Sequence, residues 1–213
     1  MTAARVLFAL LVNAIPAWGV FTQGWSVGTL LILFWWENLL GVLLIGLHLH
    51  LHQPRSADPA YRDPALMRVI NINGKDKRFA HHATGFLAMA LPFAVVHGLF
   101  AILLPYLLGQ RSGQGALWLP DSQALLTGAV MVLATLLLDF MLELPGLARR
   151  SFAVVKRRAD SRMARVLILH LVLILGAFAA ALFENPYGLL AVMILLKTAV
   201  DVAAACKAAP PAS

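Results

Sequence analysis

Six long runs of apolar residues, separated by polar segments, constrain this chain more than any other feature. A helix needs roughly 20 predominantly apolar residues to cross a bilayer, and each run has about that length. Hydrophobic residues make up 61% of the chain and charged residues only 13%. Soluble domains hold roughly 45–50% apolar and about 25% charged residues. Because such a sequence would expose large apolar patches in water, we expect it to fold in a membrane.

The runs predict an all-α bundle of six transmembrane helices, forming a single domain over residues 1–207 with a short disordered tail at 208–213. The predicted spans cover residues 5–21, 26–49, 83–108, 122–144, 163–183 and 187–205. Only Arg5 precedes the first run, and no clear small-residue cleavage site follows it. We therefore interpret the first run as a span rather than as a signal peptide.

The connections between the runs alternate in character. Two are tight turns, at residues 22–25 and 184–186, and a Gly-rich loop covers residues 109–121. The long segment at residues 50–82 contains three prolines, which predict irregular structure with a short interfacial helix at 65–72. The fourth connection, at residues 145–162, is strongly basic.

Lysine and arginine are distributed unevenly among these connections. Fifteen of the 17 lie at the termini, in the two long connections or at the adjoining start of the fifth run, whereas Arg111 alone lies on the opposite side and Lys197 falls within the last run. Because cytoplasmic loops carry an excess of basic residues, both termini are predicted to lie in the cytoplasm. The same residues predict anionic lipid headgroups as partners. The chain has no nucleic-acid-binding signature, and the sequence does not identify protein partners.

Ionisable residues inside the predicted spans are the candidates for function, because a charge in the bilayer centre is costly. Glu37 and Lys197 each lie eleven residues from the outer end of their spans, or about 16 Å deep. Asp201 follows Lys197 by four residues and shares its helix face. We therefore expect Glu37 to contact Lys197 in a three-member network with Asp201. Further candidates for this polar cluster are Asn38, Asp139 and His170.

Histidines offer a different chemistry. His48 and His52 are four residues apart and would share a helix face, a spacing that can bind Zn²⁺ or Cu²⁺. The pair His81 and His82 lies at the other end of the same connection, so the two groups could meet. His97 and His170 lie inside predicted spans, where they are candidate ligands for haem or a metal ion.

Several motifs occur in a characteristic order along the chain. They are Gly24-Trp25-Ser26, Phe34-Trp35-Trp36-Glu37-Asn38-Leu39, Val96-His97-Gly98-Leu99-Phe100, Arg165-Val166-Leu167-Ile168-Leu169-His170 and Leu196-Lys197-Thr198-Ala199-Val200-Asp201. In this order they resemble a bacterial family of integral membrane proteins, domain of unknown function 6498. The resemblance covers most of the chain, from the first span to the sixth. It singles out Glu37, Asn38, His97, Gly98, His170, Lys197, Thr198 and Asp201, and so adds Thr198 to the cluster.

The resemblance implies an architecture but no reaction. In that family the last span is often followed by histidine and acidic residues, whereas this chain has Ala204-Ala205-Cys206-Lys207. That departure weakens the prediction of a metal site at the cytoplasmic end. Cys206 is the single cysteine, so an intrachain disulfide or a cysteine cluster is excluded.

The sequence leaves three functions open. The first is an inner-membrane protein whose polar cluster relays or conducts protons or ions. The second is a haem- or metal-binding membrane protein. The third is a non-catalytic assembly or partner protein whose buried charges only fix the helix register. No HExxH, P-loop or GxSxG motif occurs, so no catalytic residue is assigned, and neither a cofactor nor an enzymatic activity is specified.

Overall fold

The computed structural model describes residues 2–52, 69–72, 75–78, 82–113, 115–147, 150–152, 154–157, 159–160 and 186–207. The fifth predicted span at 163–183, and His170 with it, lies outside the described residues. The same is true of His81, of most of the connection at 50–82 and of the tail at 208–213.

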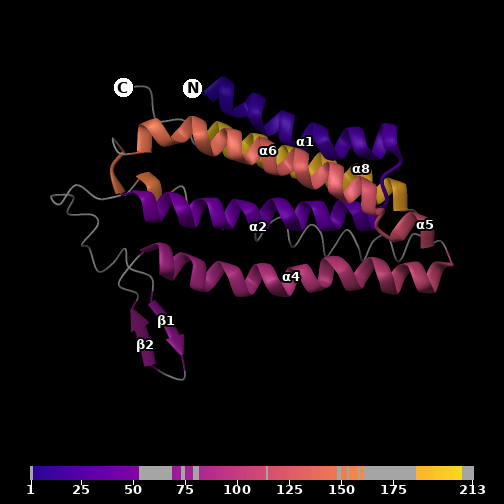
Figure 1. Cartoon of the computed structure of the whole chain (residues 1–213), viewed down its shortest axis with the longest axis horizontal. Coiled ribbons are helices and arrows are strands. Elements are labelled where there is room, and N and C mark those ends of the chain that lie inside the picture. The colour runs from indigo at the N-terminus through magenta and orange to yellow at the C-terminus, as the bar shows by residue number, and fades with distance from the viewer. Residues whose placement is uncertain are drawn as a thin grey trace.

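The described helices form a bundle whose long members lie alongside one another (Figure 1). They are α1 (Thr2–Gln23), α2 (Val27–Leu51), α4 (His82–Ser112), α5 (Gly115–Trp118), α6 (Ser122–Leu147) and α8 (Pro186–Lys207). Five of the predicted spans coincide with a long helix, so the helical character of these runs is confirmed. The helix α5 is a correction, because residues 109–121 were expected to form a loop.

The second connection contains a β-hairpin rather than a helix. Its strands are β1 (Val69–Ile72) and β2 (Lys75–Arg78), which pair antiparallel with Val69 opposite Arg78. The prediction of an interfacial helix at 65–72 is therefore wrong at 69–72, and residues 65–68 lie outside the described part. The physical reason is local, because β1 is rich in β-branched residues and the intervening Asn-Gly pair favours a two-residue hairpin loop.

A tight turn reverses the chain between α1 and α2. Gly24 has φ +65°, a left-handed conformation that glycine adopts without a steric penalty. The Trp25 amide then donates a hydrogen bond of 3.0 Å to the Gly19 carbonyl. Ser26 caps α2, since its hydroxyl accepts from the Thr29 amide at 3.1 Å. The turn therefore sends α2 back in the direction opposite to α1, and the two helices approach each other near the turn, where Val20 packs with the start of α2.

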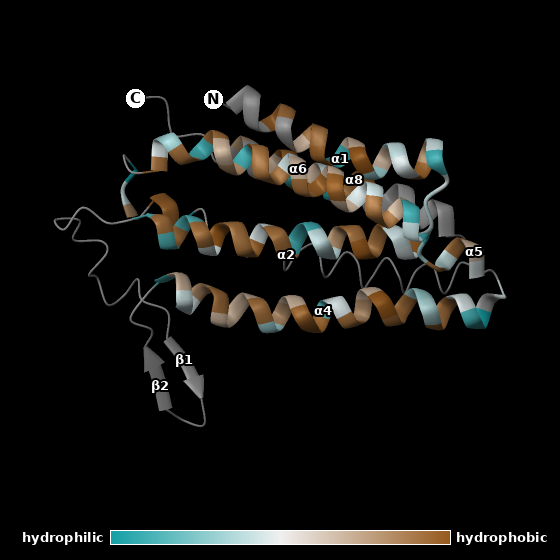
Figure 2. Ribbon diagram, in the orientation of Figure 1, coloured by the Kyte–Doolittle hydropathy of each residue, from teal (hydrophilic) through white to brown (hydrophobic). Residues whose placement is uncertain are grey.

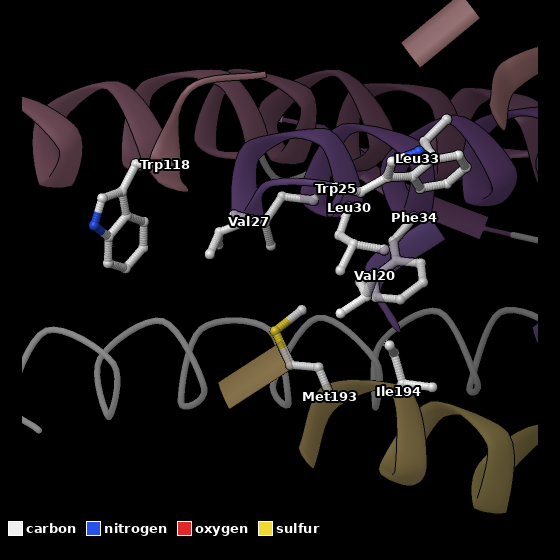
Figure 3. Packing of buried hydrophobic residues seen from close by; sticks show 10 residues of the cluster. Val20, Trp25, Val27, Leu30, Leu33, Phe34, Trp118, Met193 and Ile194 are labelled. Carbon is white, nitrogen blue, oxygen red and sulfur yellow. The ribbon is translucent and has the colours of Figure 1, made fainter. Parts of the chain in front are cut away.

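The principal apolar cluster lies where α1 ends, α2 begins and α8 approaches both. Figure 3 shows Met193 and Ile194 of α8 directed toward Val20 of α1 and toward Leu30 and Phe34 of α2. Residues early in α8 thus pack near the end of α1. Asp201, further along α8, bonds Asn13 in the middle of α1. The two helices therefore run antiparallel, and α8 ends near the level at which α1 begins.

Much of the bundle surface is apolar. Figure 2 shows mostly hydrophobic residues along the lengths of the helices, with hydrophilic ones toward their ends and at a few places midway, among them a short stretch of α2. Large apolar side chains on α4 and α6, such as Leu99, Phe100 and Leu142, are exposed. Within the described residues, Val27–Leu51, His82–Arg111 and Gly115–Leu147 are long and apolar enough to cross a membrane. These features suggest a membrane protein.

Candidate functional site

A buried lysine forms the centre of a polar cluster inside the bundle. Lys197 Nζ lies 3.1 Å from the Glu37 carboxylate and 2.9 Å from Asp201 Oδ2. It also donates a hydrogen bond of 3.0 Å to Asn13 Oδ1. The ammonium group therefore has three acceptors for its three protons. The predicted contact between Glu37 and Lys197, and the inclusion of Asp201, are confirmed as geometry.

Asn13 is the member that the sequence-based reasoning missed. Its amide nitrogen donates to Asp201 Oδ2 and to the Ala9 carbonyl, both at 2.8 Å, while its oxygen accepts from Lys197. These contacts fix which way the amide faces. Asn13 lies within the first predicted span but was left out of the candidate cluster, which consisted mainly of ionisable groups. Applying the same depth argument to amides would have included it.

The helices bring these four side chains together for simple reasons. Residues on much of the circumference of α2 are buried, so α2 is the central helix and Glu37 faces protein rather than lipid. Lys197 and Asp201 are one turn apart on α8 and therefore share a face. The α1 helix packs along α8 and contributes Asn13. The result is a desolvated cluster drawn from three helices.

Burial is nearly complete throughout the cluster. The exposed fraction is 2% for Lys197, 3% for Asp201 and Asn13, and 8% for Glu37. The Phe34 ring lies beneath the ammonium, with Lys197 Nζ 5.5 Å from the ring centroid, within cation–π range. An isolated charge in such surroundings would be strongly unfavourable. Each charged member is therefore stabilised mainly by the others.

Three of the remaining candidates are described, and none of the hydrogen bonds given above for these four side chains involves them. Asn38 is buried, but its amide nitrogen has no hydrogen-bond partner among the described residues. The Thr198 hydroxyl donates back to the Ile194 carbonyl of its own helix at 2.7 Å. Asp139 is half-buried on α6. Because His170 lies outside the described residues, its predicted contribution stays a prediction.

The histidines at the C-terminal end of α2 contact aromatic rings. His48 stacks against Phe140 with centroids 4.4 Å apart. His52 and His82 both contact Phe152, at 6.0 and 4.2 Å between centroids. The two ends of the second connection therefore meet around one phenylalanine, as their sequence positions suggested. His52 also bonds the Arg150 carbonyl through Nε2 at 2.9 Å.

His97 lies apart from this region, half-buried on α4. Its Nδ1 is 2.7 Å from the Phe93 carbonyl of the preceding turn, and its ring packs on Phe93 with centroids 4.0 Å apart. Within the residues that the structure describes, no three His, Cys, Asp or Glu side chains are grouped so as to hold a metal ion. The pairing of His97 with His170 as haem or metal ligands is untested, since His170 is not described.

Gly98, the neighbour of His97, has a packing role. A Cβ at this position would lie 2.6 Å from Trp35 Cε2, so only glycine fits beneath the indole. The same indole donates from Nε1 to the Ala94 carbonyl at 2.7 Å. The Trp35 ring therefore fixes the approach of α2 and α4, which have the most extensive contact among the described helices.

Comparison with known proteins identifies a family but no relative of known activity. No curated protein matches the chain significantly, and no solved structure does so. The model of a family described as a family of unknown function, DUF6498, matches residues 1–213. The match extends over the whole sequence and includes every helix of the polar cluster. The chain therefore belongs to the DUF6498 family.

Proposed function

We propose that this protein is a multi-pass membrane protein of a bacterial inner membrane in which a buried polar cluster relays protons. The cluster consists of Asn13, Glu37, Lys197 and Asp201. The observation that carries the proposal is the position of Lys197 Nζ, 2.9–3.1 Å from three acceptors on three side chains in a nearly solvent-free interior.

The charge of the cluster makes it a proton-binding site. With every group ionised, one ammonium faces two carboxylates, so the cluster carries a net charge of −1. Such a charge is costly in the membrane interior, and one added proton on a carboxylate removes it. Binding of a single proton by the cluster is therefore energetically favourable.

The geometry favours protons over alkali cations. A sodium or potassium ion would need the oxygens of Glu37, Asp201 and Asn13, and Lys197 Nζ already occupies the position between them. A proton can pass between an ammonium and a carboxylate along an existing hydrogen bond without displacing heavy atoms. The Lys197 ammonium thus occupies the place that a bound metal cation would take.

The topology that we propose has six spans with both ends in the cytoplasm. The antiparallel packing of α1 and α8 supports it, since α8 ends near the level at which α1 begins. Figure 1 places the hairpin β1–β2, which contains Lys75, Lys77 and Arg78, at the end of the bundle where α2 ends and α4 begins. Basic residues at that end would lie over anionic headgroups, worth about 1 kcal/mol each near the surface.

The test is proton flux in liposomes that contain the purified protein and an internal pH-sensitive dye. A pH gradient is imposed with a compensating potassium current. We expect the wild-type protein to conduct protons, and Glu37→Gln and Asp201→Asn to lower the rate roughly tenfold or more, as removal of a proton-transfer group does.

The matched control is Asp160→Asn, which removes a carboxylate paired with Lys156 at 2.6 Å outside the cluster. Its flux should equal that of wild type. Flux no faster than in protein-free liposomes would overturn the proposal and favour a purely structural role for the charges. Flux that survives in both cluster variants would also overturn it.

A further inference from the structure

A small cavity lies between the inner ends of α2 and α6, next to the basic connection. It is lined by His48 and Ile45 of α2, by Glu143 of α6 and by Arg150. Its volume of about 30 Å³ is enough for roughly two water molecules, given that each needs about 10–15 Å³ of such space. Three of its lining residues can hydrogen-bond water, so the cavity is both large and polar enough to be hydrated.

The cavity lies in line with the polar cluster along α2. His48 follows Glu37 by eleven residues, which is close to three full turns of about 3.6 residues, so both lie on one face of α2 about 16 Å apart. Asp139 and Glu143 are likewise one turn apart on α6. Counted from the outer ends of their helices, titratable groups follow one another inward. Glu37 and Lys197 come first, then Asp201, then Asp139, and last Glu143 and His48 at the same level.

We propose that this cavity is the inner port of the relay, where Glu143 and His48 exchange protons with cytoplasmic water. This inference rests on the proposed function and names the route by which the buried cluster reaches solvent. A proton taken from cavity water resides on the Glu143 carboxylate or the His48 imidazole and moves on to Asp139. Each group regains its original state when the proton leaves it, so no other reactant is needed.

The groups around the cavity are consistent with proton exchange. The Phe140 ring holds the His48 imidazole at a centroid distance of 4.4 Å. Arg150 is the positive group at the cavity, and its guanidinium nitrogens lie across Gly146 near the end of α6, where the nearest would be 3.5 Å from an added Cβ. Val154 on the cavity wall is half-exposed, so the wall borders the surface of the protein at this point.

The first test uses the same flux assay with matched histidine variants. His48→Phe keeps an aromatic ring against Phe140 but removes the titratable nitrogens, and Glu143→Gln keeps the side-chain shape. Each should lower the flux roughly tenfold or more. His50→Phe is the control, because His50 is exposed two residues further along α2 and is not part of the cavity wall. Wild-type flux in both His48→Phe and Glu143→Gln would overturn the port while leaving the relay standing.

A second test reads hydration directly and does not depend on transport. Ile45 and Leu49 belong to the same apolar cluster and are both 7% exposed, but only Ile45 lines the cavity. In a Cys206→Ser background, Ile45→Cys therefore places a thiol in the cavity wall, and Leu49→Cys places one in the same cluster away from that wall. A small water-soluble thiol reagent should modify Ile45→Cys much faster than Leu49→Cys, and only from the inner side. Equal rates would overturn the port. Absence of wild-type flux would overturn the proposed function and the port together.

Discussion

Replacing Lys197 with methionine should destabilise the protein, because it leaves the buried Glu37 carboxylate without its ion-pair partner. Among the described residues, Lys197 is the only hydrogen-bond partner of the Glu37 carboxylate, whereas Asp201 keeps its 2.8 Å bond from Asn13. Removing one partner of a buried ion pair costs about 3–5 kcal/mol, because the other charge is left uncompensated. Glu37→Gln alone should cost less, about 1.5–3 kcal/mol, since one charge-assisted hydrogen bond is weakened while Asp201 still pairs with the lysine.

The double variant Glu37→Gln with Lys197→Met shows whether the two side chains stabilise each other or merely lie close together. If the two side chains stabilise each other, removing the stranded carboxylate should make the double variant more stable than Lys197→Met alone, with a coupling of about 1–3 kcal/mol. Asp160→Asn added to Lys197→Met is the control and should restore nothing, because Asp160 pairs with Lys156.

Unfolding in mixed micelles, followed by tryptophan fluorescence, measures the four free energies of this cycle. Destabilisation of the double variant equal to the sum of the two single effects would refute the reasoning, because it would mean that Glu37 and Lys197 act independently. The same unfolding measurement shows whether a cluster variant that loses proton flux is still folded.

Three further predictions concern the bundle and its topology. In a Cys206→Ser background, Arg111→Cys should react with an impermeant reagent added to intact cells and Arg157→Cys should not; labelling of Arg157→Cys from outside would contradict the topology. Gly98→Ala should destabilise the protein by about 1–3 kcal/mol, because its Cβ would lie 2.6 Å from the Trp35 ring, whereas Gly115→Ala meets its nearest atom at 3.6 Å and should be neutral in unfolding assays. Neutralising the five basic residues of the fourth connection should weaken association with anionic lipids in co-flotation assays, and unchanged association together with unchanged topology would refute the anchoring role. These five are Arg149, Arg150, Lys156, Arg157 and Arg158.

The parts of the fold that were predictable from the sequence depend on one physical rule. Helices in hydrocarbon must satisfy their backbone internally, so length and apolarity located five of the described helices. The same reasoning placed Glu37 and Lys197 at one depth, and the structure joins them. Depth along a helix does not say which way a side chain faces. It was still enough to predict the contact between Glu37 and Lys197, because an unpaired buried charge is so costly that each must face a partner of opposite charge at its own depth.

The failures came where local chemistry decides instead of membrane depth. The β-hairpin depends on an Asn-Gly pair between short strands, and that signal was overlooked among the prolines of the same connection. Asn13 escaped because the set of candidates was built around charge, although a buried amide also needs partners. The cavity beside His48 depends on how α2, α6 and Arg150 pack together. Sequence spacing on one helix does not determine such packing.

The most direct test of the central claim is whether the buried cluster gains and loses a proton. Infrared difference spectroscopy of the reconstituted protein, recorded as the pH is stepped, detects the carbonyl stretch of a protonated carboxyl group. We expect such a band in the wild-type protein, and we expect Glu37→Gln or Asp201→Asn to remove or shift it while Asp160→Asn leaves it unchanged. A spectrum in which no carboxyl band changes with pH, or in which the band is indifferent to both cluster variants, would contradict the proton relay.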